Sequence, residues 1–563
     1  MGRRLLIAVI LGLILAPSAN ARPTQVMPGV TYDHILQWTP AGPVQMYVVT
    51  APRPGGLYSL TPLLSNGTIV GRERISSIER NASAQMTTIG VNGDFFHWTG
   101  GWPSGLLIRA GVVEHQPVFN RAAVGVDTTG TIHVDRVPWY TRWQGPSKSS
   151  YYLAAMNGPV RKNSATLFTP VWGGNTPAVQ GAVVVLEPFP PAVARRDLTG
   201  TVTAVATGGS VPIPADGAVL AARGTAAQHL LEEAVVGSPL TLRIPLPADW
   251  ATVTDAVSGG PTLVKDGKPI ANAGEALTRV QLRGRDPRTA VGQRADGGIV
   301  LVAVDGRQPH WSVGITNWDL GQVLLRYGCV TGFALDSGGS TTIAFDGKVL
   351  NRPSDPGGER PVAEALVVGY TGVYAPAPAP TLSPNGDGVD EREKLGYKLV
   401  RPATVSAKLV APNGTAREVD AGAKGTGRYE LSWDGKDVAG APAPEGRYHW
   451  KVSATDDLGR ASSDDRSFTL DNTLGFLRLS AGARRISFTL ARDAQIRVTI
   501  EKPWGDIMRT VALGPRSAGR VTVRWNGRDA RRRRLARGSY VVRVAATGPI
   551  GLSVLRAPLR ISR

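Results

Sequence analysis

A chain of 563 residues is too long to fold around one hydrophobic core, so several domains are expected. Its 42% of hydrophobic residues excludes wholesale disorder, and 67 glycines with 42 prolines favour short strands and turns over long helices. The formal net charge of +19 is uneven, because residues 476–563 hold 20 Lys and Arg against four acids, which places +16 there and +3 in the rest.

The N-terminus has the pattern of an export signal. Arg3 and Arg4 precede an apolar run over residues 5–16, and an Ala-Asn-Ala cleavage pattern follows at 19–21. Retention as a membrane anchor is the alternative, but the apolar run is short for a bilayer span and no later segment approaches that length. The sequence therefore predicts a signal peptide at 1–21 and a secreted, extracellular protein.

The single cysteine limits what can hold the fold together. Cys329 can form no intramolecular disulfide, and one thiol excludes a thiolate metal cage. It lies next to an apolar stretch, which favours a buried thiol over a catalytic one. No pair of histidines has the helical spacing of a zinc site, so the sequence requires no cofactor.

Residues 22–374 are predicted to form one strand-rich α+β domain. Short strands alternate with turns, and helical periodicity is confined to two short segments. The expected strands include 42–49, 68–70, 122–126, 131–134, 182–186, 201–206, 240–244 and 298–304, and the expected helices are 225–235 and 320–327.

A predicted strand at 88–91 runs directly into Asn92, Gly93 and Asp94. Two aromatic residues come next, whereas an ordinary hairpin turn would be followed by polar residues. This order favours a binding site in which Asn92 and Asp94 face a ligand and an aromatic ring walls the pocket. A plain type I′ turn is the alternative.

Two more polar clusters flank a buried strand. Arg288 and Thr289 open an apolar segment, and Asp305 and Arg307 close the strand predicted at 298–304. Each cluster alone is an ordinary turn. Several such clusters at successive strand ends favour one shared site over unrelated turns.

The third cluster lies in the segment 333–342, where an apolar run leads into Asp336. Gly338, Gly339 and Ser340 follow, with further hydroxyls behind them. Glycines let the backbone approach a ligand closely, and free amides beside a carboxylate can bind an oxygen-rich anion. An ordinary strand that ends in a polar turn is the alternative.

In this order the motifs resemble the phosphodiester glycosidase family. They are NGDFF, the SGGP segment, DPRTAVG, VDGR, LDSGGSTT and NRP, and the similarity covers about residues 44–370. This family includes the uncovering enzyme, which removes N-acetylglucosamine from a phosphodiester on lysosomal targeting glycans. Many relatives carry glycine where this chain has Ser337 and Asp94. The resemblance implies hydrolysis of a sugar-1-phosphodiester, such as one of an N-acetylglucosamine-like sugar, in an extracellular or cell-wall glycan.

A sugar-1-phosphodiester needs less acid catalysis than an ordinary glycoside, because the phosphate ester leaves as a stable anion. Guanidiniums can grip the phosphate oxygens, and carboxylates can activate water or stabilise positive charge at the sugar carbon. Retention and inversion at that carbon are both open at this point. We predict catalytic roles for Asp336, Asp305 and Arg307. The predicted substrate-binding residues are Asn92, Gly93, Asp94, Arg288, Thr289, Gly338, Gly339, Ser340, Asn351 and Arg352.

The composition changes at residues 375–381, where alternating Ala and Pro predict a stiff, extended linker. An internal repeat follows with a shift of 92 residues, as from Trp433 to Trp525. Alternating strands at this period predict two all-β immunoglobulin-like sandwiches, repeat 1 at 382–471 and repeat 2 at 472–563. They resemble the immunoglobulin-like repeat of flagellar hook-capping proteins, which implies an accessory role.

Repeat 1 opens with clustered oxygen donors. Asn385, Asp387 and Asp390 lie among glycines and could hold a structural Ca²⁺. Their spacing departs from a full EF-hand loop, so a turn rich in Asp and Asn is the alternative.

The basic character belongs to repeat 2. It predicts a tether to an anionic cell-wall polymer and hence a wall-associated protein. Nucleic acid is disfavoured as the partner, because the arginines at 531–534 lack interleaved aromatic residues and the chain carries an export signal. A solvated loop without a partner is the alternative for this run. The alternative function is a non-catalytic wall-binding or adhesion protein with a degenerate glycosidase-like domain.

Overall fold

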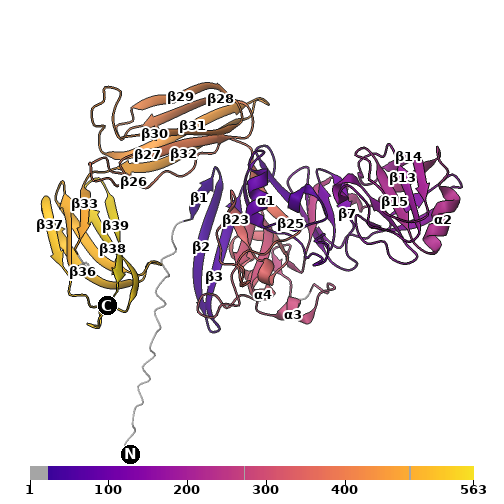
Figure 1. The fold of residues 1–563 in the computed structure, drawn as a ribbon, viewed down its shortest axis with the longest axis horizontal. Coiled ribbons are helices and arrows are strands. Elements are labelled where there is room, and N and C mark those ends of the chain that lie inside the picture. Colours follow the sequence, from indigo (N-terminus) through magenta and orange to yellow (C-terminus); the bar gives the residue numbers. More distant parts are fainter. Residues whose placement is uncertain (1–22, 272, 481–483, 563) are drawn as a thin grey trace, which may run out of the picture.

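The computed structural model describes residues 23–271, 273–480 and 484–562. The signal peptide predicted at 1–21 lies outside them. The described residues form a strand-rich α+β domain followed by two all-β sandwiches, which confirms the predicted fold class (Figure 1). The α-helices are α1 (Ile75–Ala82), α2 (Thr225–Glu233), α3 (Arg279–Arg283) and α4 (Asn317–Arg326). Within these ranges, no helix is long and apolar enough to cross a membrane.

The first domain is built on an eight-stranded sheet of order β1-β2-β3-β21-β20-β22-β18-β19. Its central strand β21 reads Ile-Val-Leu-Val-Ala-Val, and all six residues are buried because both faces of the sheet are covered. In sheet order the strands are β1 (Thr24–Met27), β2 (Val30–Thr39), β3 (Gly42–Ala51), β21 (Ile299–Val304), β20 (Arg288–Arg294), β22 (Cys329–Ala334), β18 (Thr262–Lys265) and β19 (Lys268–Pro269).

Helix α4 covers one face of this sheet. Leu320 and Leu324 lie one helical turn apart and pack into the same core cluster as the strands. The helix is capped by Thr316, whose Oγ1 accepts the backbone N–H of Asp319 at 3.1 Å. Gly332 of β22 leaves room for the helix, since a Cβ there would lie 2.6 Å from the Cδ1 of Leu324. Cys329, buried in the same cluster as predicted, has a pKa raised to about 12 by its burial.

Two five-stranded sheets enclose a second core against the opposite face. Val91, Phe333 and Leu366 are buried together in this core. One sheet contains, in order, β24 (Lys348–Val349), β23 (Ile343–Phe345), β5 (Thr87–Asn92), β25 (Glu364–Tyr370) and β4 (Tyr58–Leu64). The other contains β7 (Val112–His115), β6 (Leu107–Arg109), β17 (Val253–Ser258), β8 (Ala123–Asp127) and β9 (Ile132–Asp135).

Antiparallel pairing brings the polar strand ends together. Arg288, the first residue of β20, lies opposite Val304, the last residue of β21. Asn92, the last residue of β5, lies opposite Ala365 near the start of β25. Since an antiparallel strand starts where its neighbour ends, segments that are far apart in the sequence meet at one edge of the domain.

A closed barrel is inserted between β9 and β17, in a region to which the sequence patterns assigned no role. Trp143, Leu153 and Leu220 are among the fully buried residues of its core. Figure 1 shows the barrel on the side of the first domain away from the sandwiches. Its strands, in order, are β10 (Arg142–Gln144), β11 (Ser150–Met156), β12 (Ala165–Phe168), β15 (Ala218–Ala222), β13 (Ala182–Leu186), β14 (Asp197–Ala206) and β16 (Pro239–Arg243).

Each sandwich pairs two sheets of mostly antiparallel strands. Repeat 1 contains β26 (Thr381–Leu382), β32 (Ala461–Leu470), β31 (Gly446–Asp456), β28 (Ala403–Val410) and β29 (Ala416–Lys424), facing β27 (Glu393–Leu399) and β30 (Gly427–Trp433). Repeat 2 contains β33 (Leu474–Leu479), β34 (Arg485–Leu490) and β37 (Gly519–Arg524), facing β36 (Ile507–Arg516), β35 (Ala494–Glu501), β38 (Gly538–Thr547) and β39 (Leu552–Ile561).

The two repeats share equivalent hydrogen bonds as well as sequence motifs. The indole of Trp433 donates to the carbonyl of Lys436 at 2.7 Å, and the indole of Trp525 donates to the carbonyl of Arg528 at 3.0 Å. The sequence shift of 92 residues therefore matches a shared local structure. Of the predicted linker 375–381, Ala375 is buried in the core of repeat 1, so the sandwich begins to pack before that stretch ends.

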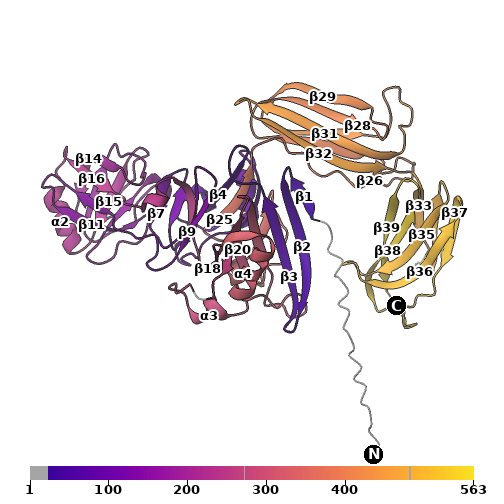
Figure 2. The same ribbon diagram turned by 180° about the vertical axis from the view of Figure 1, so that it is seen from behind.

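Repeat 1 is docked on the first domain through a buried arginine. Arg466 donates to the carbonyl of Gln25 at 2.8 Å and to that of Ala375 at 2.8 Å, and it pairs with Asp464 at 3.0 Å. A buried lysine, Lys398, reaches across the same interface to Asp346 of the first domain. Both views show repeat 1 lying across the end of β1 and β2 (Figures 1 and 2).

Removing the docking arginine is expected to destabilise the protein. Arg466→Ala would leave the Asp464 carboxylate buried without its cation, which costs about 3–5 kcal/mol. We expect a lower melting temperature in calorimetry than for Arg447→Ala, which removes an exposed arginine of repeat 1 whose guanidinium donates to the Ser467 hydroxyl. Equal melting temperatures for the two variants would contradict this account of the interface.

Candidate active site

The loop after β22 holds Asp336 at the edge where the polar strand ends meet. The backbone N–H of Ser337 donates to its carboxylate at 2.7 Å, and the Ser340 hydroxyl donates at 2.6 Å. The carboxylate is almost completely buried, and this burial raises the pKa of Asp336 to about 6 despite these two bonds. A carboxyl group that titrates near neutrality can exchange a proton with a reactant.

The side chains of Asn92 and Thr289 hold this loop in place through hydrogen bonds. Asn92 Nδ2 donates to the carbonyl of Asp336 at 2.8 Å, and its Oδ1 accepts from the Thr289 hydroxyl at 2.7 Å. Both residues are fully buried. Their side chains are committed to the protein, so a substrate contact of the predicted kind would cost one of these hydrogen bonds.

Asp94 belongs to a second carboxyl cluster beside the loop. Its carboxylate pairs with Arg121 at 2.6 Å and accepts from the N–H of Gly105 at 2.7 Å. The N–H of Asp94 in turn donates to Glu364 at 2.6 Å, while Gly93 donates its N–H to the Glu364 carbonyl at 3.0 Å. Asp94 is therefore a buried ion-pair partner that ties β5, β25 and the segment before β8 together.

Glu364 is a functional-site residue that sequence reasoning missed. Burial raises its pKa well above the usual range, and the negative charges of Asp94 and Asp336 add to this effect. Its Oε2 is buried and faces no partner in the described part of the chain. Glu364 is the one acid at the head of the otherwise apolar strand β25, and that isolated charge was the available signal.

The Asp305 carboxylate is surrounded by hydrogen-bond donors. Its carboxylate accepts hydrogen bonds from Tyr47 at 2.9 Å, Trp311 at 2.7 Å, Asn351 at 2.9 Å and the N–H of Arg352 at 3.1 Å. Burial raises its pKa, and these donors oppose that rise. With four donors on two oxygens, Asp305 is placed to position the Asn351–Arg352 segment.

Two arginines with carboxylate partners flank the glycine pair after Asp336. Arg307 forms a bidentate pair with Asp286, at 2.7 and 2.9 Å. Arg360, which no sequence motif indicated, forms a bidentate pair with Asp355 at 2.7 and 2.8 Å. Each pair holds its guanidinium plane in one orientation.

The two glycines let these guanidiniums reach the backbone. A Cβ at Gly338 would lie 2.7 Å from Arg307 Nη2, and one at Gly339 would collide with Arg360 and Asp355. Gly338 also has a φ of +70°, which other residues rarely adopt. Arg360 donates to the Ser340 hydroxyl at 3.3 Å, which connects it to Asp336.

Arg288 is buried directly beneath the loop. It donates to the carbonyl of Gly284 at 2.6 Å and weakly to the Ser337 hydroxyl at 3.4 Å. Its Nε is buried and has no acceptor among the described residues. Burial lowers the pKa of Arg288 from its ordinary value, and the negative charges of Asp286 and Asp336 oppose this shift.

The oxygen-rich loop of repeat 1 forms a network of turns. Asn385 Oδ1 accepts the N–H of Asp387 at 3.1 Å, and the Asp387 carboxylate accepts from the N–H groups of Val389 and Phe476. Phe476 belongs to repeat 2, so the loop joins the two sandwiches. Within the described ranges, no group of three or more His, Cys, Asp or Glu side chains is arranged to hold a metal ion.

Comparison with known proteins assigns the domains. The phosphodiester glycosidase family profile matches residues 192–369, and the FlgD Ig-like domain profile matches 382–457 and 477–549. The first match includes the SGGP, DPRTAVG, VDGR, LDSGGSTT and NRP motifs, while NGDFF precedes it.

Two curated proteins match short segments. The SPbeta prophage-derived uncharacterized protein YomE of Bacillus subtilis is 44% identical over 108 residues, which are 19% of this chain and 16% of that protein. The N-acetylglucosamine-1-phosphodiester alpha-N-acetylglucosaminidase of Bos taurus is 40% identical over 68 residues, or 12% of each chain. The matched segments thus span less than a fifth of these relatives.

A solved structure shares the fold of the first domain. The crystal structure of a hypothetical protein from Synechocystis aligns with a TM-score of 0.52 at 23% identity, over 61% of this chain and 62% of that chain. The profile matches agree with the family resemblance and the two repeats expected from the sequence. The chain therefore carries a domain of the phosphodiester glycosidase family, followed by two FlgD Ig-like domains.

Proposed function

We propose that this chain is a secreted hydrolase that cleaves a sugar-1-phosphodiester, such as one of N-acetylglucosamine, in an extracellular or cell-wall glycan. The observation that carries the proposal is the Asp336 loop. It combines a buried carboxylate with two glycines and places a guanidinium on either side, Arg307 and Arg360. This arrangement suits a substrate that joins a sugar to a phosphate.

The guanidiniums would bind the phosphate. Arg307 uses Nε and Nη2 for Asp286, so its Nη1 has no protein acceptor within the described chain and can donate to a phosphate oxygen. Arg360 holds its remaining nitrogen beside Ser340. Their positive charge would neutralise the leaving phosphate monoester as the bond between the sugar C1 and its oxygen breaks.

Asp336 would act at the sugar carbon. In its ionised form it takes a proton from water, whose oxygen bonds to C1 while the phosphate monoester leaves with the electron pair of the broken bond. Asp305 would position Asn351 and Arg352 rather than transfer protons, because four donors already occupy its oxygens. Glu364 and Asp94 would hold the turn at Gly93 in place.

We also propose that repeat 2 tethers the enzyme to an anionic cell-wall polymer. Arg485 lies directly opposite Arg524, and Arg543 directly opposite Arg556, in the strand registers of repeat 2. Like charges in such positions repel each other, and a bound polyanion would relieve the repulsion.

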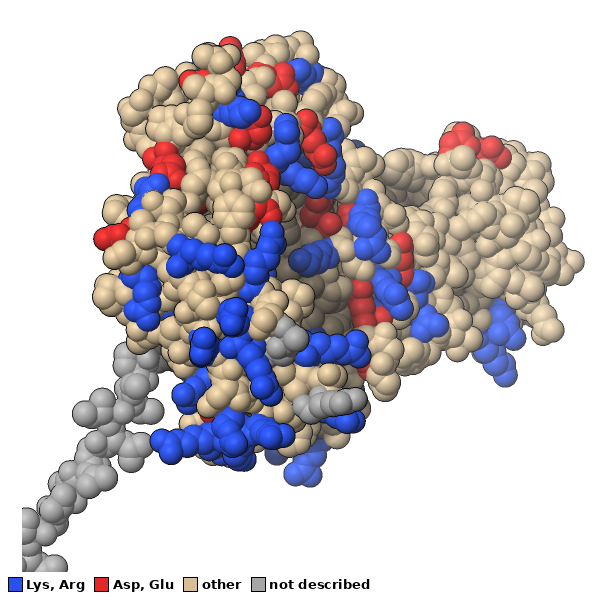
Figure 3. All heavy atoms as spheres, turned by 60° about the vertical axis from the view of Figure 1, so that its left-hand side comes forward, with Lys and Arg blue, Asp and Glu red and all other residues tan. Residues whose placement is uncertain are grey.

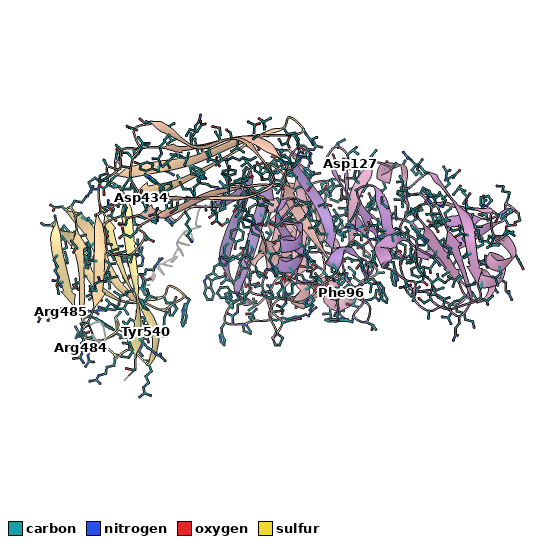
Figure 4. All side chains as sticks on the ribbon, turned by 45° about the horizontal axis from the view of Figure 1, so that its top comes forward. Phe96, Asp127, Asp434, Arg484, Arg485 and Tyr540 are labelled. Atoms are coloured by element: carbon teal, nitrogen blue, oxygen red, sulfur yellow. The ribbon has the colours of Figure 1, made fainter. Side chains whose placement is uncertain are left out.

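Repeat 1 provides the internal comparison for this surface. Its strands β31 and β32 place Lys451 opposite Asp465, and the two form an ion pair at 3.5 Å. Lys and Arg gather on repeat 2 where acids are sparse (Figure 3). Arg484 and Arg485 lie at the outer end of repeat 2, away from Asp434 of repeat 1 (Figure 4).

Loss of the central carboxylate is expected to abolish turnover. Asp336→Asn should lower kcat on a sugar-1-phosphodiester by about 10²–10⁴-fold, because water then lacks its proton acceptor. Asp249→Asn, an exposed acid of the barrel insertion, is the control and should behave as wild type. Released sugar measures turnover. A wild-type protein that releases no sugar from any such substrate would instead favour the non-catalytic wall-binding protein.

Activity should fall on the acid side of pH 6. The ionised carboxylate is the reactive form, and its pKa is raised to about 6, so protonation removes activity as the pH drops through that value. We expect kcat/KM to fall about tenfold per pH unit well below pH 6 and to level off above it. A profile that is flat from pH 4 to 8 would contradict the role of Asp336.

Placing an acid on the basic surface of repeat 2 should weaken its binding to the cell wall. Arg556→Asp places an acid opposite Arg543, as Asp465 lies opposite Lys451 in repeat 1. Less of this variant should therefore sediment with purified cell wall. Arg447→Asp makes the same charge change on repeat 1 and should retain binding. Wild-type binding should fall as salt rises. Binding that does not change with salt concentration, or an equal loss of binding in both variants, would rule out this surface as the tether.

A further inference from the structure

A cavity of about 520 Å³ lies next to Arg360 and has no part in the proposed chemistry at the sugar carbon. It lies between the segment before α1 and the turn that follows the NGDFF motif. Its lining residues are Gly71, Arg72, Trp98, Thr99, Gly100 and Pro361. None of these is an acid, so the lining carries positive charge and one large aromatic surface.

Arg360 connects this cavity to the candidate active site. Its guanidinium carbon lies 5.2 Å from the centre of the Trp98 ring, and its Nη1 donates to the Ser340 hydroxyl at 3.3 Å. Ser340 in turn donates to Asp336. A ligand that leaves the Asp336 loop past Arg360 therefore arrives at Trp98.

Arg72 forms the far wall and differs from Arg307 and Arg360. Its guanidinium carbon lies 5.2 Å from the Trp98 ring centre and 5.9 Å from that of Phe96, which Figure 4 labels. Arg307 and Arg360 each have an aspartate partner. Arg72 is exposed, and no hydrogen bond or ion pair joins its guanidinium to another described residue. A cation held on aromatic faces without an acid is free to bind an external anion.

Trp98 offers an exposed aromatic surface that a sugar ring can contact. The residue is 61% exposed, which is unusual for a tryptophan held in place by its neighbours. Its turn is fixed, since Gly101 donates its N–H to the carbonyl of His97 at 2.7 Å and Gly71 donates to that of Gly100 at 3.1 Å. The ring is therefore presented by a preformed loop.

We propose that Arg72, Trp98 and Arg360 form a subsite for the group on the far side of the scissile phosphate, and that this group is a sugar bearing a second phosphate. The exposed part of Trp98 would pack against the sugar, and Arg72 would bind the second phosphate. Both guanidinium carbons lie 5.2 Å from the same ring centre, so both cations are within reach of one sugar unit that carries a phosphate on each side. The inference rests on the proposed function and narrows its substrate to a polyanionic sugar-phosphate chain.

The test compares two synthetic substrates of the same sugar. One is a methyl sugar-1-phosphodiester with a single phosphate, and the other is an oligomer joined by two or more phosphodiesters. We expect wild type to prefer the oligomer in kcat/KM and to lose part of this preference at high salt. Arg72→Gln and Trp98→Ala should each reduce the preference about tenfold, mainly through KM. Arg243→Gln, an exposed arginine of the barrel, should keep it.

The outcomes separate this subsite from the proposed function. Equal preference in wild type and Arg72→Gln, or a wild-type preference for the methyl substrate, would overturn the subsite while hydrolysis stands. If wild type hydrolyses neither substrate, the proposed function fails and calorimetric titration with the oligomer decides. A tenfold weaker affinity of Arg72→Gln would then support the subsite, and unchanged affinity would reject it.

Discussion

Burying a carboxylate beside an apolar core costs several kcal/mol unless donors, a cation or a proton compensate for it. Four such groups lie around one edge of the first domain, and each is compensated differently. Asp305 has four hydrogen-bond donors, Asp94 has the guanidinium of Arg121, and the raised pKa of Glu364 favours its neutral form. Asp336 has two donors and, within the described part of the chain, no cation in direct contact, so it is the least compensated of the charged members. That imbalance distinguishes the carboxyl group proposed to react from those proposed to support it.

The glycine pair after Asp336 determines where the cations of the site can lie. A side chain at either position would displace a guanidinium, so Gly338 and Gly339 set how closely Arg307 and Arg360 approach the loop. The aspartate partners then fix the direction in which each guanidinium faces. Local backbone freedom and long-range ion pairing thus depend on each other, and neither alone would bring two cations to one loop.

The sequence was informative where a contact depends on neighbouring residues. Asp336 and the glycine pair stand out as an apolar run that meets a polar loop, and helix α2 was expected to begin at Thr225, where it does. Glu364 and Arg360 were missed because their roles depend on residues far away in the chain, such as Asp94, 270 positions before Glu364. The barrel was missed because its strands carry no motif and close only through pairing of distant segments. Helix α4 begins before the predicted residue 320, because Thr316 caps it.

The docking of repeat 1 restricts how the molecule could move once attached to a surface. A flexible linker would let an anchored catalytic domain sweep through a wide volume, whereas the buried contacts of Arg466 and Lys398 remove that freedom at this joint. The ion pair of Glu445 with Arg492 and the turns around Asp387 constrain the next joint in the same way. An anchor at repeat 2 would therefore set the height and the angle at which the Asp336 loop meets a polymer. Substrate selection would then depend on the geometry of attachment as well as on chemical recognition.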